Sequence, residues 1–302
     1  MSLFGGERAI AAQMRQATTM NLSRRHLHGR IAATLFMLAT SLAVVFLAIL
    51  LLTLVVRGWD RLSWHLLTNY HSRFVEQAGL HAALLGTLWL ISITGLFAFT
   101  VGISAAIYLE EYAPRTRWTR ILDTNISNLA GVPSVVYGLL GLALFVELAN
   151  LGRTIVAGAL TLGLLILPII IIASREAMRA VPSSLREAAF ALGATQWQVT
   201  RHHVLPSAMP GILTGTILAI SRAIGETAPI LVAGATGFVL FRPDSPLSQY
   251  TALPIQIYTW TTRPQKEFHD LAAAGIIVLL LVLLSLNATA IYLRQRLSKT
   301  RW

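Results

Sequence analysis

Two charged residues, Arg222 and Glu226, stand four positions apart within an apolar stretch of this 302-residue sequence. A guanidinium offers a planar fork of donors that suits a tetrahedral oxyanion. A carboxylate four residues later can orient that fork and offset its charge while no anion is bound. Inserting a charged side chain at the centre of a bilayer costs on the order of 3 kcal/mol of free energy. Two charged residues in one apolar segment therefore call for a functional or a structural explanation. We predict that Arg222 and Glu226 line an anion pathway; the alternative is an ion pair that only holds two helices together.

The composition places this pair in a membrane protein. The sequence is 55% hydrophobic and only 12% charged, too little charge to cover the surface of a soluble domain of this length. Cysteine is absent, which excludes disulfides and thiolate metal sites, and we expect no metal site. A net charge of +11 would suggest nucleic acid as the partner of a soluble protein. In a membrane protein Lys and Arg mark cytoplasmic loops, so we expect membrane lipids and no nucleic acid around this chain.

Six apolar stretches are long enough to cross a bilayer core of ~30 Å, which needs about 20 residues per helix. We therefore predict an all-α polytopic membrane protein with six transmembrane helices. The predicted spans are Ile31–Val56, Leu80–Leu109, Leu129–Ala149, Thr154–Ala173, Met209–Ala235 and Leu271–Leu293.

The distribution of Lys and Arg predicts the orientation of these spans. Sixteen of the 24 Lys and Arg residues fall in the basic tails 1–30 and 294–302 and in the loops after the second and fourth spans. Seven fall in the opposite loops, so the positive-inside rule puts both termini in the cytoplasm. Arg175 lies at the cytoplasmic end of the fourth span. We predict a second anion contact there; an ordinary positive-inside arginine is the alternative.

The loop after the fourth span carries the signals of two short helices. Ser184–Glu187 matches a capping box, in which the serine accepts from the third amide and the glutamate reaches back. Gly193 supplies a left-handed C-cap. Thr195–Gln198 matches a second box, and we expect its helix to end at Leu205–Pro206. We predict a rigid hairpin over 182–206 that docks into another protein; a helix pair lying flat on the lipid surface is the alternative.

This loop resembles the EAA–G–LP loop of bacterial ABC importer permeases. In that family the loop is a coupling helix that inserts into a cleft of a cytoplasmic ATPase. The resemblance covers a permease domain over 80–293 and leaves the first helix, 31–56, and its tail outside. The residues that match the motif, and that the resemblance assigns to ATPase coupling, are Glu187, Ala188, Ala189, Gly193, Leu205 and Pro206.

Two further stretches are similar to the phosphate-specific permease subunits of such importers, the PstA type. They read GVPSVVYGLLGL from Gly131 and SRAIGETAPIL from Ser221. The resemblance implies the type I ABC importer permease fold and a subunit that moves inorganic phosphate from periplasm to cytoplasm across the bacterial inner membrane. It also implies three kinds of partner: a sibling permease subunit, two copies of a cytoplasmic ATPase and a periplasmic phosphate-binding protein.

Motifs that do not occur narrow the function further. The sequence has no G-x-x-x-x-G-K-[ST] loop, so we expect no cofactor in this chain and ATP to be used by partner subunits. It has no H-E-x-x-H or G-x-S-x-G either, which favours a transport subunit over an enzyme. Two alternatives to phosphate import stay open. One is a permease for sulfate or molybdate; the other is a passive anion channel or membrane scaffold, which would have no use for a rigid hairpin.

Overall fold

The computed structural model describes the backbone of residues 4–299 and the side chains of residues 26 and 28–296. Parts of the two predicted basic tails, 1–30 and 294–302, therefore lie outside the described residues. The described backbone is helical throughout its regular elements and contains no strand. The chain divides into two compact units at Val56 and Arg57, and each is described by itself.

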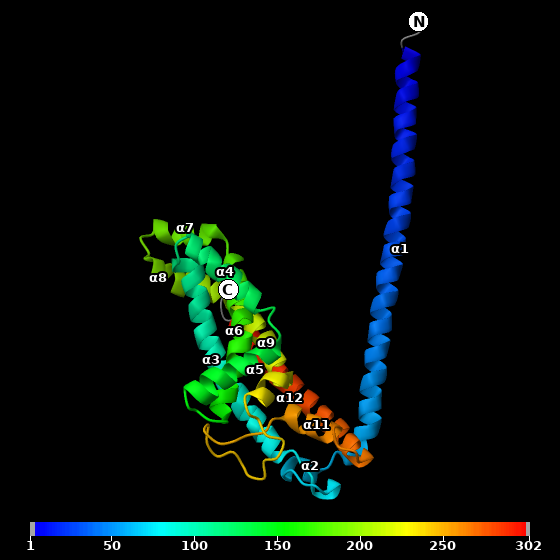
Figure 1. Ribbon diagram of the computed structural model, residues 1–302. Coiled ribbons are helices and arrows are strands. Elements are labelled where there is room, and N and C mark those ends of the chain that lie inside the picture. The colour runs from blue at the N-terminus through cyan, green and yellow to red at the C-terminus, as the bar shows by residue number, and fades with distance from the viewer. Residues whose placement is uncertain (1–3, 300–302) are drawn as a thin grey trace. The chain divides into compact units, whose positions relative to one another are not determined.

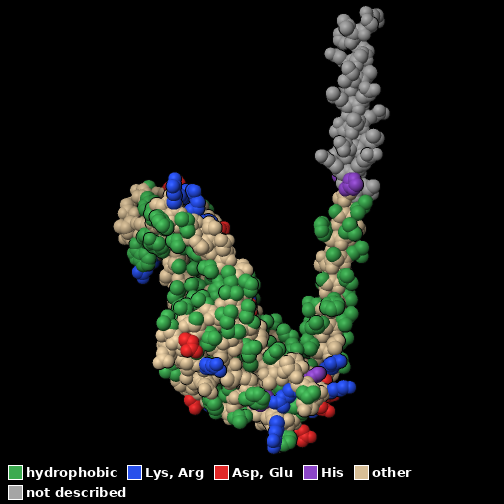
Figure 2. Space-filling model, in the orientation of Figure 1, with side chains coloured by type: hydrophobic (Ala, Val, Ile, Leu, Met, Phe, Trp, Pro, Cys, Tyr) green, Lys and Arg blue, Asp and Glu red, His purple; other side chains and the backbone are tan. Residues whose placement is uncertain are grey.

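The first unit consists of helix α1 (Phe4–Gly58), which continues beyond the unit by two residues. Within α1, apolar side chains between Ile31 and Val56 are exposed around the helix, coloured green in Figure 2. The segment His28–Arg61 is long and apolar enough to cross a membrane. A helix that is apolar on all sides is expected of a span in lipid.

The second unit is a helical bundle built around α6 (Ile155–Arg179), which packs most extensively against α3 (His81–Ile107) and α9 (Leu205–Gly225). Helix α12 (Lys266–Lys299) packs against α9 and α11. The remaining helices are α2 (Trp64–Thr68), α4 (Arg117–Leu129), α5 (Ser134–Gly141), α7 (Ser183–Ala191), α8 (Gln196–Val199), α10 (Ala228–Val232) and α11 (Leu253–Thr261).

Short turns extend several of these helices. Two are 3-10 turns, η1 (Trp59–Arg61) and η2 (Val75–Gln77). Three are π-helical turns, η3 (Tyr108–Tyr112), η4 (Leu142–Leu148) and η5 (Thr200–Val204). Helices α7, α8 and α4 gather at one end of the bundle, which we call the hairpin end (Figure 1). Helix α2 and the segment 233–252 lie at the opposite end, which we call the loop end (Figure 1).

The third span differs from its prediction as one helix over Leu129–Ala149. Helix α4 ends at Leu129 and α5 begins at Ser134, with a bend of 106° between them, and the two segments Arg117–Leu129 and Ser134–Leu148 are long and apolar enough for a span only when taken together. Pro133 explains the break, because a proline disfavours helical geometry in the residue before it. The Tyr137 hydroxyl donates to the Leu129 carbonyl (2.9 Å) and so satisfies one acceptor that the break exposes.

The fifth span also differs from its prediction as one helix over Met209–Ala235. Helix α9 ends at Gly225, Glu226 is extended, and α10 starts at Ala228. The proposed helix end at Leu205–Pro206 is wrong as well, because the helix continues from α8 through η5 into α9. Pro206 is accommodated in the first turn of α9, directly after η5 has interrupted the regular hydrogen-bond ladder.

Helices α6 and α9 approach closely at two glycines of α9. A Cβ atom on Gly211 would lie 2.8 Å from the Ala177 Cβ, and one on Gly215 would collide with Ala173. Small residues four positions apart let two helix backbones come this near. The absence of side chains at these two glycines therefore allows a close contact between α6 and α9. This contact fixes the register of α9 against α6, and with it the height of Arg222 in the bundle.

Candidate functional site

The hairpin at 182–206 begins without the first predicted capping box. Helix α7 starts at Ser183, Pro182 occupies the N-cap position, and no side chain caps the helix. Ser184 is therefore the second residue inside the helix, where its side chain cannot serve as the N-cap. The predicted box at Ser184–Glu187 is wrong for this reason.

The turn between the two hairpin helices forms as predicted. Gly193 adopts φ +82°, and its amide donates to the Phe190 carbonyl (2.9 Å). The amide of Ala194 donates to the Ala189 carbonyl (3.1 Å), which completes a Schellman motif. The second capping box is confirmed, because backbone and side chains of Thr195–Gln198 bond reciprocally. The hairpin turn is thus hydrogen-bonded on both sides.

The tip of this hairpin presents apolar surface. Leu192 is 90% exposed, and Phe190 and Trp197 are also exposed. Glu187 and Ala188 are exposed beside them, whereas Ala189 is buried and anchors α7 to the bundle. Exposed apolar side chains gathered at a rigid projection are typical of an interaction site.

Arg222 and Glu226 form the predicted ion pair, with the Arg222 Nε 3.1 Å from Glu226 Oε1. The pair spans the C-terminal end of α9, because Arg222 lies in its last turn and Glu226 is the first residue beyond it. The Arg222 side chain is 45% exposed and the Glu226 side chain 18% exposed. Arg222 therefore lies partly exposed at the surface of the bundle, while Glu226 is largely covered by it.

Two polar groups that the sequence did not single out accompany this pair. The first is the Tyr137 hydroxyl of α5, a helix that packs against α10 just beyond Glu226, where a Cβ atom on Gly138 would lie 2.8 Å from the Pro229 Cα. Ser221 donates to the Asn287 Oδ1 of α12 (2.6 Å), which fixes α9 next to α12. Hydroxyl and amide bonds of this kind hold helices together inside a membrane.

Arg175 lies apart from Arg222. It is level with the Gly211–Gly215 contact, and Arg222 is about nine residues further along α9, or roughly 13 Å at 1.5 Å per residue. The Arg175 guanidinium is held by carboxylates, with Nε 3.1 Å from Glu110 Oε2 and Nη2 3.2 Å from Asp123 Oδ2. A second, very short bond joins Arg175 Nη1 to Asp123 Oδ1. The role of Arg175 as a second anion contact stays a prediction.

The loop end carries a separate cluster around His71, which is buried. The Gln256 Nε2 lies 2.6 Å from His71 Nδ1, and the Arg263 Nη2 lies 3.1 Å from Nε2. Because arginine only donates, His71 Nε2 accepts, so the imidazole is neutral and carries its proton on Nδ1. The Gln256 side-chain amide then presents its oxygen to Nδ1, with the amide O and N exchanged. Burial, followed by the Arg263 charge, lowers the pKa of His71 below its ordinary value of 6.5. The Phe238 ring packs edge-on against the imidazole.

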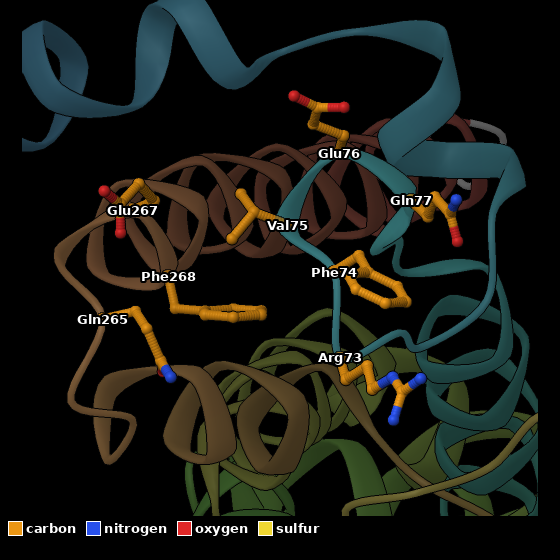
Figure 3. A pocket seen from close by; sticks show the side chains of 8 residues that line it. All are labelled: Arg73, Phe74, Val75, Glu76, Gln77, Gln265, Glu267 and Phe268. Atoms are coloured by element: carbon orange, nitrogen blue, oxygen red, sulfur yellow. The ribbon is translucent and has the colours of Figure 1, made fainter.

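A cavity also lies at the loop end. It has a volume of about 520 Å³ and contains none of the predicted site residues (Figure 3). A second cavity of about 380 Å³ lies at the hairpin end and includes Arg175, Arg179 and Asp123 in its wall. Among the described residues no group of three or more His, Asp or Glu side chains is placed to hold a metal ion. The residues that line the cavity in Figure 3 are Arg73, Phe74, Val75, Glu76, Gln77, Gln265, Glu267 and Phe268.

Comparison with known sequences identifies relatives over most of the chain. Residues 98–299 match the family described as binding-protein-dependent transport system inner membrane component. The chain is 34% identical over 275 residues to phosphate transport system permease protein PstA 1 of Mycobacterium tuberculosis, covering 90% of this chain and 89% of the relative. It is 31% identical over 287 residues to probable ABC transporter permease protein YqgI of Bacillus subtilis, covering 91% and 98%.

Solved structures share the fold. The chain superimposes with a TM-score of 0.63 on a chain of a bacterial alginate ABC transporter in complex with an alginate pentasaccharide-bound periplasmic protein, at 17% identity over 85% of this chain and 91% of that chain. An inward-facing MetNI methionine ABC transporter gives a TM-score of 0.56 at 18% identity, over 71% and 94%. At these identities the likeness concerns the fold alone, and it confirms the predicted importer permease fold. The chain belongs to the binding-protein-dependent transport system inner membrane component family, whose members are multi-pass membrane permeases.

Proposed function

We infer that this chain is the membrane-spanning permease subunit of an ATP-driven importer and that its cargo is inorganic phosphate. Relatives named phosphate transport system permease proteins, alike over about nine-tenths of the chain, support the cargo. The observation that carries the mechanism is the Arg222–Glu226 pair at the break between α9 and α10. Broken helices at membrane depth are tolerated where they line a cavity or a pathway, and such breaks are typical of transport sites.

Arg222 would receive the anion, and Glu226 would regulate how tightly it is held. The Arg222 side chain is 45% exposed at the surface of the bundle, where a sibling permease subunit would complete the pathway. Arg222 can donate two bonds to a phosphate, while Glu226 keeps one edge of the guanidinium occupied when no anion is present. A pathway has to release its anion as well as attract it, and a paired arginine meets both demands better than an unpaired one.

The hairpin would transmit the work of ATP hydrolysis, which takes place in two copies of a cytoplasmic ATPase. Its exposed tip, with Leu192 and Phe190, provides an apolar surface for a cleft in that partner. The tight turn at Gly193 keeps the projection rigid, as a lever requires. A passive channel or a scaffold would not need this element.

The proposed docking of the hairpin on a cytoplasmic ATPase also implies how the chain is oriented in the membrane. The hairpin end and both chain termini would lie in the cytoplasm, and the loop end would face the periplasm and a phosphate-binding protein. The excess of Lys and Arg on the hairpin side supports this orientation in the bacterial inner membrane.

The proposal is tested by purifying this chain with its sibling and ATPase subunits and measuring ATP hydrolysis in nanodiscs. Phosphate-loaded binding protein should stimulate hydrolysis, and the same protein without phosphate should stimulate it less. Equal stimulation by a sulfate- or molybdate-binding protein would contradict the cargo. Failure of the ATPase to co-purify under any nucleotide condition would support the channel or scaffold instead.

A further inference from the structure

Two adjacent glutamates in the π-helical turn η3, at the end of α3, have carboxylates that bond to different parts of the hairpin end. The carboxylate of Glu111 is only 4% exposed. It accepts from Arg186 Nη2 (3.0 Å), which belongs to α7, and from Gln196 Nε2 (3.4 Å), which opens α8. The same Gln196 amide donates to the Glu111 backbone carbonyl (3.2 Å). One residue of η3, whose side chain is buried, thus holds both helices of the hairpin.

Arg186 extends this attachment to the end of α6. Its Nη1 donates to the Val181 carbonyl (2.8 Å), and its Nη2 donates to the Met178 carbonyl (2.9 Å). The guanidinium therefore makes three charge-assisted bonds to three separate acceptors, a geometry that lysine cannot reproduce. Because Glu111 and Arg186 are largely withdrawn from water, separating them would leave an uncompensated buried charge. Separation of the hairpin from the end of α3 is therefore costly.

Glu110 makes the complementary set of contacts. Its two oxygens accept from Arg175 Nε (3.1 Å) and Arg179 Nε (3.0 Å), both on α6. The other edge of the Arg175 guanidinium holds Asp123 of α4. Neighbouring residues of a helix point about 100° apart, so one glutamate could not serve both sets of partners. A π-turn at this position is notable, because such turns frequently mark functional sites.

The contacts of Glu110 continue to the bend beside the anion site. Asp123 lies in α4, and the last residue of that helix, Leu129, accepts the hydroxyl bond of Tyr137. Tyr137 in turn belongs to α5, which packs against α10 just beyond Glu226. The Asp123 side chain is 39% exposed, far more than Glu110 or Glu111, so of these three carboxylates it is the one that water solvates most readily when its bond to Arg175 opens.

We propose that Glu110 and Glu111 form a joint that transmits movement of the hairpin to the α4–α5 bend. Glu111 fixes the hairpin to α3, and Glu110 passes the displacement through Arg175 to Asp123, whose contact is made in one state and released in the other. These are positioning residues, which touch neither the anion nor ATP. This inference rests on the proposed function, because it assumes that the hairpin docks on an ATPase.

The test compares phosphate uptake with ATP hydrolysis in proteoliposomes that contain the full complex. Glu111→Gln removes the acceptor that faces Gln196, and Asp123→Asn weakens the bidentate contact with Arg175. Both should lower the phosphate transported per ATP by about 2- to 30-fold, while ATP hydrolysis persists. Glu176→Gln is the matched control, because its carboxylate is 63% exposed and pairs with Arg179 within one helix. The control should keep the ratio of the unmodified complex.

The positions of the variants separate the joint from a structural role. Asp123 lies in α4, outside the hairpin, so ATPase binding should be unchanged in Asp123→Asn. If the residues act in series, the Glu111→Gln, Asp123→Asn double variant should be little worse than the poorer single variant. An unchanged transport ratio in Asp123→Asn would overturn the joint. A proportional loss of uptake and hydrolysis in Glu111→Gln, with fully additive effects in the double variant, would overturn it as well.

Transport by the unmodified complex tests the proposed function, whereas the ratios of the variants test the joint. Failure of the unmodified complex to transport phosphate would count against the proposed function. Normal phosphate transport, together with unchanged ratios in both variants, would count against the joint alone. If Glu111→Gln does not accumulate in the membrane, Asp123→Asn decides the question by itself, since its more exposed side chain is the safer one to change.

Discussion

Neutralising Arg222 and neutralising Glu226 should have different effects on transport, although the two residues form one ion pair. Arg222 is 45% exposed, so the pair contributes at most about 1 kcal/mol to folding of this chain. Arg222→Gln should therefore reach the membrane at a normal level. It removes two charge-assisted bonds to the anion, each about 1.5–3 kcal/mol. A loss of at least about 3 kcal/mol corresponds to a reduction in phosphate uptake of about a hundredfold or more.

Glu226→Gln should change transport in another way. It leaves the guanidinium in place and frees the edge that Glu226 Oε1 occupies at 3.1 Å. Phosphate should then bind more tightly and leave more slowly, so that the KM for uptake and the maximal rate both fall. A lower rate with a lower KM is the expected sign that a competing internal partner has been removed.

The assay is initial-rate uptake of labelled phosphate by the two single variants and the double variant, at matched membrane levels. If the pair serves only to hold the helix end in place, the Gln–Gln double variant leaves no uncompensated charge and should recover much of the function. A double variant that transports nearly as well as the unmodified protein would refute the pathway role of Arg222. Retained inactivity of the double variant is the result that we expect.

Four further outcomes follow from other parts of the structure. Gly193→Val places a β-branched side chain at φ +82°, which costs on the order of 1–2 kcal/mol, so a pull-down should recover less ATPase at a normal membrane level. Gly215→Leu forces α6 and α9 apart at a cost of about 1–3 kcal/mol and should lower the melting temperature in detergent. The lowered pKa of His71 means that the unfolded chain takes up this proton first, so the loop end is fully stable above about pH 6.5 and loses stability as the pH falls. Proteolysis of the segment 233–252 should therefore accelerate between about pH 7 and pH 5, and His71→Gln should remove most of that change. Leu192→Cys, in a chain with no other cysteine, should resist an impermeant thiol reagent added outside intact cells, and ready labelling there would reverse the proposed topology.

Local signals in the sequence were sufficient for the elements that depend on neighbouring residues. The Schellman turn at Gly193 and the box at Thr195–Gln198 are confirmed, because each is decided within about six residues. The contact at Gly211 and Gly215 was predictable too, since small residues at this spacing have few other uses in a membrane helix. Hydrophobic periodicity and capping residues therefore predict most of the helices of this fold.

The predictions of helix bounds were wrong where an apolar run concealed a helix break, or where a matching consensus concealed an earlier helix start. The apolar runs over Leu129–Ala149 and Met209–Ala235 predict single helices, whereas Pro133 and the Glu226–Thr227 dipeptide break them. The serine of the box at Ser184 fits the consensus, but the N-cap position is Pro182, two residues earlier, which leaves the Ser184 side chain inside the helix. Helix breaks and helix starts depend on one or two residues, which an average over a window of about 20 residues does not resolve.

The ion pairs at the hairpin end could not be predicted from the sequence. The partners Glu110 and Arg175 are 65 residues apart, and Glu111 and Arg186 are 75 apart. The single available clue was a pair of acidic residues at the end of an apolar span. That clue indicates a polar contact but not its partner, which only the packing of α3 against α6 determines.

Accumulation of labelled phosphate inside proteoliposomes tests phosphate import most directly. The vesicles contain this chain with its sibling and ATPase subunits, with ATP on the hairpin side and the loaded binding protein on the other. We expect phosphate to accumulate above its concentration on the binding-protein side only when ATP is present, and an approximately tenfold excess of sulfate or molybdate to leave this uptake unchanged. Phosphate that merely equilibrates, at the same rate with and without ATP, would contradict import and indicate a passive channel.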